Sequence, residues 1–142
     1  MAKRILVVED NPSAKRLICY TLEQEGYQML NASNGVEGLR MAREEKPDLL
    51  VLDVMLPGLD GFELCHRLRT DPQTAWLPIL ILSAKAQDAD ISVGLRMGAD
   101  DYLTKPADPA EIVKRVAKLL AKRSNAHSET GEKGLPDSEA KG

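Results

Sequence analysis

The chain has 142 residues and a formal net charge of −3, with 43% hydrophobic and 29% charged residues. This length suits one domain with a single core, and the composition is that of an ordinary soluble globular protein. No apolar run approaches the roughly 20 residues of a membrane span, and the slightly acidic balance argues against a nucleic-acid-binding surface as the main function. Because nothing near the N-terminus indicates a signal peptide, the expected compartment is the cytoplasm.

Five segments have the pattern of strands, and each is followed by a helical segment. The predicted strands are short apolar runs bounded by turn residues, at Ile5–Val8, Tyr27–Ala32, Leu49–Leu52, Pro78–Ala84 and Asp101–Pro106, the last ended by its proline. The helical segments begin after capping residues, as where Asn11 precedes Pro12 or where Asp60 stands three residues before Glu63. Strict alternation of strands and helices predicts one α/β domain, a parallel sheet with helices on both faces.

The hydrophobic pattern ends near Arg123. Residues 124–142 are rich in Ser, Glu, Gly and Lys, a composition typical of disordered segments. The sequence therefore predicts a folded domain at residues 1–123 and a disordered tail at 124–142. Because such a tail is too short for a DNA-binding or catalytic domain, we expect either a stand-alone domain or a piece of a larger multidomain protein.

Polar side chains lie at the ends of four of the predicted strands. Glu9 and Asp10 lie at the end of the first, Asp53 at the end of the third, Ser83 at the end of the fourth and Lys105 at the end of the fifth. The carboxyl ends of parallel strands gather at one edge of a sheet, where ligands bind in open α/β folds. Neighbouring carboxylates need a cation, and an all-oxygen set with room for phosphate suits Mg²⁺. An aspartate can act as the nucleophile that accepts a phosphoryl group, with a lysine neutralising its charge.

The motifs at these strand ends resemble the receiver domain of two-component response regulators. The resemblance covers residues 3 to about 122 and rests on Val8-Glu9-Asp10-Asn11, Asp53-x-x-Leu56-Pro57-Gly58-x-Asp60-Gly61, Leu82-Ser83-Ala84 and Gly98-Ala99-x-Asp101-Tyr102-x-x-Lys105-Pro106. It implies a flavodoxin-like (βα)5 fold with strand order 2-1-3-4-5. It also implies a signalling switch that catalyses its own phosphorylation and dephosphorylation, rather than a turnover enzyme.

The resemblance assigns the acidic residues to phosphate and metal chemistry. Asp53 would accept the phosphoryl group from a kinase phosphohistidine. Asp10 and Asp53 would bind Mg²⁺ directly, Glu9 mainly through water, and Met55 through its backbone carbonyl.

On the phosphate side, Lys105 would contact the phosphoryl group, and Ser83 and Tyr102 would form a switch pair. Ala107 stands where many receivers carry an aromatic residue, a departure expected to loosen the packing at the start of the last helix. The implied partners are a histidine kinase or phosphotransfer protein and a downstream protein target, together with a phosphorylation-dependent homodimer. Neither DNA nor a membrane is expected as a partner.

Other functions fit the sequence less well. A haloacid-dehalogenase-like phosphatase would need a carboxylate at position 55, where this chain has methionine. Nucleotide enzymes of the common phosphate-binding types are disfavoured because neither GxxxxGK[ST] nor GxGxxG occurs. A phosphotransfer intermediate or phosphate sink stays open, and the sequence names neither the kinase nor the output partner.

For four further residues the sequence predicts a structural role rather than a functional one. Cys19 and Cys65 fall inside helical patterns without metal-ligand spacing, so we expect reduced packing residues. His66 is expected as a surface or half-buried side chain of the third helix rather than as a phosphohistidine, and Trp76 is expected to pack.

Overall fold

The structure is a computed structural model that describes residues 2–133. Over these residues the chain forms five strands and five helices in strict alternation. They are β1 (Arg4–Val8), α1 (Pro12–Glu23), β2 (Gln28–Ala32), α2 (Gly35–Glu45), β3 (Leu49–Leu52), α3 (Gly61–Thr70), β4 (Ile79–Ser83), α4 (Asp88–Arg96), β5 (Asp101–Thr104) and α5 (Pro109–Lys133).

All strand pairs of the sheet are parallel, and the strand order is β2-β1-β3-β4-β5. The predicted fold class and strand order are therefore confirmed. β3 and β4 are buried along their whole length, whereas the edge strands β2 and β5 are only partly buried. This difference explains why the two edge strands have the weakest apolar runs in the sequence.

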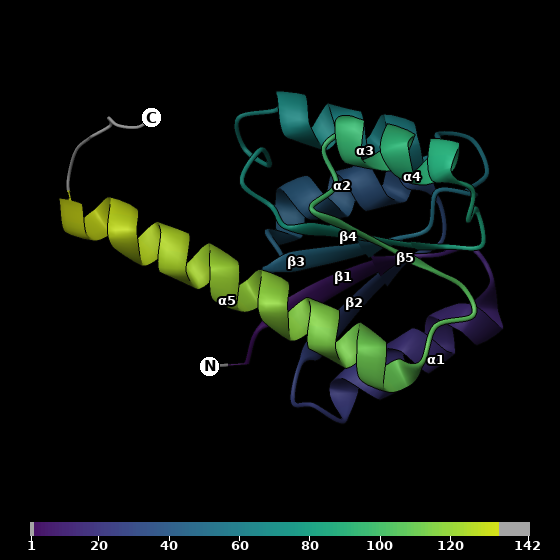
Figure 1. Cartoon of the computed structure of the whole chain (residues 1–142), viewed down its shortest axis with the longest axis horizontal. Helices are drawn as coiled ribbons and strands as arrows, with labels where there is room; N and C mark the ends of the chain where they lie inside the picture. Colours follow the sequence, from purple (N-terminus) through teal and green to yellow (C-terminus); the bar gives the residue numbers. More distant parts are fainter. Residues whose placement is uncertain (1, 134–142) are drawn as a thin grey trace.

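The helices form one layer on each face of the sheet (Figure 1). Alternate residues of each strand point to opposite faces, so Leu6 and Val8 pack with α2 and α3, while Ile5 and Val7 pack with α1 and α5. Figure 1 shows α4 on the same side as α2 and α3. This arrangement leaves the carboxyl edge of the sheet covered by loops alone.

The C-terminal helix is longer than the sequence predicts. Residues 124–133 continue α5, where we expected disorder, and Figure 1 shows this end of the helix extending past the sheet. The prediction followed the apolar stripe, which does end near Arg123, whereas a helix that has already formed is extended residue by residue without the cost of a new first turn. The predicted disorder of residues 134–142 lies outside the described residues.

Side-chain caps start the helices that follow the strand ends of the site. The Oδ1 atom of Asn11 accepts a hydrogen bond from the N–H of Ala14 at 2.9 Å, directly after Glu9 and Asp10. The Oδ1 atom of Asp60 accepts one from the N–H of Glu63 at 3.0 Å. Both caps match the sequence prediction, and each fixes the loop between a site residue and the next helix. Within residues 2–133, no helix has the length and hydropathy needed to cross a bilayer.

Candidate functional site

The polar strand-end residues lie at one edge of the sheet, as the alternation of strands and helices predicts. Backbone hydrogen bonds continue the ladder past the strands, from Asp53 N–H to the Val8 carbonyl at 3.0 Å and from Lys105 N–H to the Ser83 carbonyl at 2.8 Å. Beside them is an open cleft of about 690 Å³, lined by Glu9, Asp10, Asn11, Pro12, Ala14, Asp53, Met55 and Lys105. The cleft therefore contains most of the predicted phosphate and metal residues.

Lys105 joins the two buried carboxylates of the cleft. Its Nζ donates to Glu9 Oε1 at 2.6 Å and to Asp53 Oδ2 at 3.1 Å. Glu9 and Asp53 are 2% and 6% exposed, so each needs such a charged partner. Backbone N–H groups hold the other oxygens: Asn11 donates to Glu9 Oε2 at 3.1 Å, and Met55 donates to Asp53 Oδ1 at 2.9 Å. The Asp53 carboxylate is thus fixed in orientation at the base of the cleft.

Burial and charge act against each other on the pKa values of this group. Burial raises the pKa of Glu9, and the hydrogen bonds from Lys105 and from the Asn11 N–H oppose that rise only in part. For Lys105, burial by itself lowers the pKa, but the hydrogen bonds to Glu9 and Asp53 and their charges outweigh it, so its pKa is raised. Lys105 therefore remains an ammonium at neutral pH and can face an anion.

The oxygen groups around the cleft suit a hard cation. Asp10 and Met55 are exposed at its rim, while Asp53 is buried at its base. Among residues 2–133, no group of three or more His, Cys, Asp or Glu side chains is already arranged around one metal position. Magnesium does not require such a group, because it binds through one or two carboxylates and keeps several waters. The donor chemistry and the open volume thus fit Mg²⁺ held by Asp10, Asp53 and the Met55 carbonyl.

The predicted switch pair meets at the backbone of Lys85. Ser83 is fully buried, and its Oγ accepts a hydrogen bond from the Lys85 N–H at 3.3 Å. The Tyr102 hydroxyl donates to the Lys85 carbonyl at 2.7 Å, and Tyr102 is only 8% exposed. The Tyr102 ring is therefore already buried in the unphosphorylated chain. Burial raises the pKa of Tyr102, as do the charges of Asp90 and Asp53.

Two residues that sequence reasoning missed complete this part of the site. Lys85 acts through its backbone, which leaves no trace in the pattern of side chains. Gly94, buried on α4, packs against the Tyr102 ring. A glycine inside a predicted helix is a recognisable signal for close packing. For Gly94 it is the sequence signal that could have indicated the contact with Tyr102.

Ala107 lies beside the site, at the edge of a second hollow. An apolar groove of about 390 Å³ lies there, lined by Ala14, Leu17, Ile18, Leu82, Ala84, Lys105, Pro106, Ala107 and Ile112. Lys105 and Ala14 also line the acidic cleft, so the two hollows adjoin.

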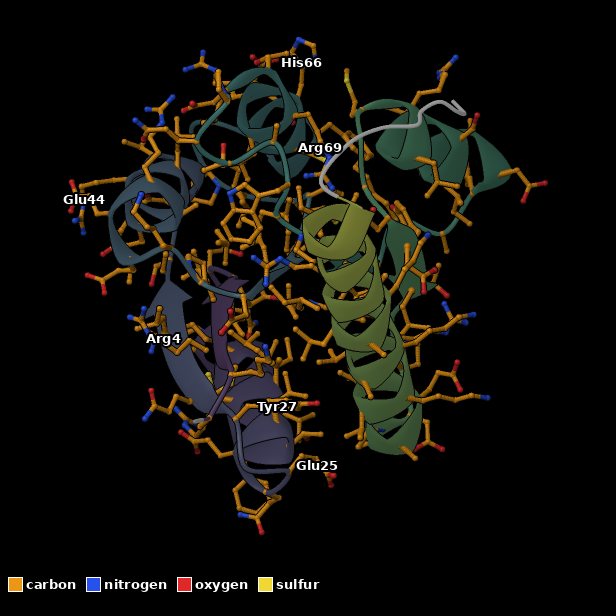
Figure 2. The ribbon with its side chains drawn as sticks, turned by 90° about the vertical axis from the view of Figure 1, so that its left-hand side faces the viewer. Arg4, Glu25, Tyr27, Glu44, His66 and Arg69 are labelled. Atoms are coloured by element: carbon orange, nitrogen blue, oxygen red, sulfur yellow. The ribbon has the colours of Figure 1, made fainter. Side chains whose placement is uncertain are left out.

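The histidine and the tryptophan for which the sequence predicts structural roles, His66 and Trp76, are not among the residues that line the cleft. His66 is exposed, and Figure 2 shows it on the outer surface of α3. The Trp76 ring packs under the guanidinium of Arg123 at 4.2 Å, so it is a packing residue at the C-terminal end of the folded body. Cys19 and Cys65 are free thiols inside α1 and α3, as expected.

The chain is similar to known proteins over most of its length. The chain is 49% identical over 132 residues to the alkaline phosphatase synthesis transcriptional regulatory protein PhoP of Bacillus subtilis, a match that covers 93% of the chain and 54% of PhoP. It is 42% identical over 118 residues to Protein PilH of Pseudomonas aeruginosa, covering 83% of the chain and 98% of PilH. The chain thus spans about half the length of PhoP and nearly all of PilH.

A solved structure places a metal in the corresponding fold. The receiver domain of a sensor histidine kinase from Pseudomonas aeruginosa, solved with a magnesium ion coordinated in its active site cleft, superposes with a TM-score of 0.80 and 30% identity. That match covers 85% of this chain and 99% of the solved one. The family sequence model of the response regulator receiver domain matches residues 5–117. The chain therefore belongs to the response regulator receiver domain family.

Proposed function

We propose that the chain accepts a phosphoryl group on Asp53 from the phosphohistidine of a histidine kinase or phosphotransfer protein, in a Mg²⁺-dependent reaction. One observation carries the proposal: the oriented Asp53 carboxylate lies at the base of an open acidic cleft, 3.1 Å from the Lys105 ammonium. Family membership and the magnesium-bound receiver structure of the kinase from Pseudomonas aeruginosa support it.

In the proposed reaction an Asp53 oxygen is the nucleophile. It forms a bond to phosphorus as the phosphorus–nitrogen bond of the donor breaks, and the bonding electron pair returns to the imidazole nitrogen. The Met55 N–H holds Asp53 Oδ1, which keeps the carboxylate in one orientation during the approach. The Asp53 carboxylate neither gains nor loses a proton in this step.

Two cations would neutralise the negative charge of the phosphoryl and carboxylate oxygens during the reaction. Bound Mg²⁺ would supply the larger charge, neutralising carboxylate and phosphoryl oxygens together. Lys105 supplies the second, and its raised pKa keeps it protonated. A lysine ammonium about 4 Å from a phosphate oxygen is worth roughly 4 kcal/mol at an effective dielectric near 20, before the cost of desolvation.

Phosphorylated Asp53 acts as a signal because its phosphate oxygens attract side chains that bind other partners in the unphosphorylated protein. Lys105 exchanges Glu9 for phosphate, and the Ser83 hydroxyl turns from the Lys85 N–H toward a phosphoryl oxygen. Since Lys85 also holds Tyr102, this change passes to the face formed by residues 86–122. The output is altered binding of a kinase, phosphatase or downstream protein, or a symmetric dimer. The chain acts as a cytoplasmic switch rather than as a turnover enzyme.

A phosphotransfer experiment tests the proposal. A histidine kinase labelled on its phosphohistidine is mixed with the wild type and Asp53→Asn, with Mg²⁺ or with excess chelator. Label should move to the wild type only when Mg²⁺ is present, and Asp60→Asn should behave as the wild type. Transfer to Asp53→Asn would contradict the assignment. NMR shift changes confined to the loops around Asp53, with unchanged self-association and partner affinity, would make the chain a phosphate sink.

A further inference from the structure

Gly94 is the one residue of α4 that is fully buried, and it faces the ring of Tyr102. A β-carbon at position 94 would lie 2.8 Å and 2.9 Å from Tyr102 Cδ2 and Cε2, and 3.0 Å from Ile81 Cδ1. Carbon atoms do not pack this closely, so any larger residue displaces the ring or the helix. Glycine weakens the interior of a helix, and its presence here calls for such a reason.

The buried ring is held from the other side by its hydroxyl. That group donates to the Lys85 carbonyl at 2.7 Å, in the loop that follows Ser83. The ring therefore fills the space between the β4–α4 loop and α4. β5 is an edge strand that pairs only with β4 over the described residues, so no further strand blocks a movement of the ring toward solvent.

We propose that Gly94 is a positioning residue for the switch, and that its missing side chain is what allows Tyr102 to be buried with its hydroxyl on Lys85. Even one methyl group at position 94 shifts the ring to an exposed position. The inference rests on the proposed function for its signalling meaning, because Tyr102 connects the Ser83 loop with α4. Its geometry holds for the unphosphorylated chain as well.

The consequence for output is a coupling between the ring and α4. Because Gly94 is the buried residue of α4 and its nearest neighbours are Tyr102 and Ile81, the Tyr102 ring is part of the surface on which this helix lies. A ring that leaves this place removes that support and changes the face that α4 and β5 present. The residue at position 94 therefore determines how strongly phosphorylation in the acidic cleft changes the surface of α4 and β5.

Fluorine NMR of protein labelled with 3-fluorotyrosine tests the proposal in the free chain. The chain has three tyrosines, of which Tyr20 is 60% exposed and serves as an internal reference, and loss of a signal in Tyr102→Phe assigns Tyr102. The shift of the Tyr102 signal between H₂O and D₂O measures its contact with solvent. We expect a small solvent shift in the wild type and a value close to that of Tyr20 in Gly94→Ala.

Gly38→Ala is the matched control. On α2, the β-carbon of an alanine at position 38 would lie 2.8 Å and 3.1 Å from side-chain atoms of Val8 on β1. The clash is therefore similar in size, but its nearest neighbours are Val8 and Leu64 rather than Tyr102. It should leave the Tyr102 signal unchanged. A Tyr102 signal that stays protected in a folded Gly94→Ala overturns the proposal, and so does exposure that Gly38→Ala reproduces.

A double-mutant cycle covers the case in which Gly94→Ala does not fold. In a Tyr102→Leu background the ring is absent, so Gly94→Ala should fold as well as Tyr102→Leu alone. Equal damage with and without the ring contradicts the proposal. Intact mass after treatment with an acyl phosphate is recorded for the same variants, so failure of Asp53 phosphorylation is seen separately from failure of the ring to move.

Discussion

The Lys105 ammonium lies closer to Glu9, at 2.6 Å, than to the proposed phosphoacceptor Asp53, at 3.1 Å. In the free chain this lysine is the cation that neutralises two buried carboxylates. A metal ion or a phosphoryl group that enters the cleft must therefore compete with an existing ion pair. The following predictions use this arrangement and the packing around it.

Lys105→Ala leaves Glu9 and Asp53 without their shared cation. Without Mg²⁺ we expect a loss of about 1–3 kcal/mol of unfolding free energy, because two buried carboxylates lose a charged donor. Added Mg²⁺ should restore much of this loss and bind more tightly than to the wild type, since a positive charge is gone. Urea unfolding with and without Mg²⁺ measures both effects, with the exposed Lys114→Ala as control. A Lys105→Ala protein that binds Mg²⁺ more weakly, or that switches normally when phosphorylated, would refute the assigned role.

Mg²⁺ affinity should depend on Asp10 more than on Glu9. Asp10 is exposed at the rim of the cleft and can coordinate a metal directly, whereas the Glu9 carboxylate already accepts hydrogen bonds from Lys105 and from the Asn11 N–H. We expect Asp10→Ala to weaken Mg²⁺ binding by at least about tenfold, or 1.4 kcal/mol, and Glu9→Gln to weaken it less. Asp10→Ala should also fold normally, because it removes a charge from an acidic cleft. Calorimetric titration decides the point, and an Asp10→Ala protein with wild-type affinity would rule out direct ligation.

The buried thiol of Cys65 should make stability fall at high pH. Burial raises its pKa from 9.0 to about 11, while the charge of Arg69 lowers it and that of Asp100 raises it by smaller amounts. A raised pKa in the folded state means that the stabilisation is complete below the unfolded pKa and is lost as pH rises from about 9 through about 11. The loss attributable to this thiol is on the order of 2–3 kcal/mol.

Unfolding free energies between about pH 8 and pH 11 test this, because the difference in steepness between Cys65→Ala and the wild type reports the thiol. Cys19, Tyr27 and Tyr102, whose pKa values burial also raises, contribute to the rest of the decline. Cys65→Ala should show a shallower decline than the wild type, even if it is less stable at neutral pH. Cys19→Ala, at a half-buried site, is the matched control and should retain most of the steepness. Identical slopes in Cys65→Ala and the wild type would show that the thiol is not protected by burial.

Arg69 should contribute more to stability than a helix-surface arginine. Figure 2 shows Arg69 turned inward from α3, where its guanidinium donates to the carbonyls of Gly98 and Leu77 and to the Asp100 carboxylate, at 2.8, 2.6 and 2.7 Å. A lysine cannot reproduce this forked set of bonds, so Arg69→Lys should cost about 1–3 kcal/mol. Arg67→Lys on the same helix, whose partner Glu63 is exposed, should stay within about 0.5 kcal/mol. Equal urea midpoints for the two variants would count against the network.

The parts of the site that sequence predicts are those that follow from strand ends. The apolar runs place Glu9, Asp53 and Lys105 at the carboxyl ends of β1, β3 and β5, and parallel pairing gathers these ends at one edge of the sheet. The helix caps at Asn11 and Asp60 are local, so a few residues of sequence determine them. These features agree with the structure because each depends on periodicity or on a short motif.

The parts that sequence does not predict depend on contacts between distant segments. Arg69 has the pattern of a surface residue, yet it binds loops 6–31 residues away. The buried state of Tyr102 depends on the backbone of Lys85 and on the absence of a side chain at Gly94. The sharing of Lys105 between Glu9 and Asp53 also follows only from the three-dimensional distances. Residue patterns carry no information about which of two neighbouring carboxylates a lysine approaches more closely.

Intact-mass spectrometry after treatment with a small acyl phosphate tests the central claim most directly, because it needs no partner protein. The wild type with Mg²⁺ should gain the mass of one phosphoryl group, and removal of Mg²⁺ should prevent the gain. Asp53→Asn should show none under either condition, while Asp60→Asn should react as the wild type does. A phosphoryl adduct that persists on Asp53→Asn, or a wild-type protein that is never modified, would contradict the assignment of Asp53 as the phosphoacceptor.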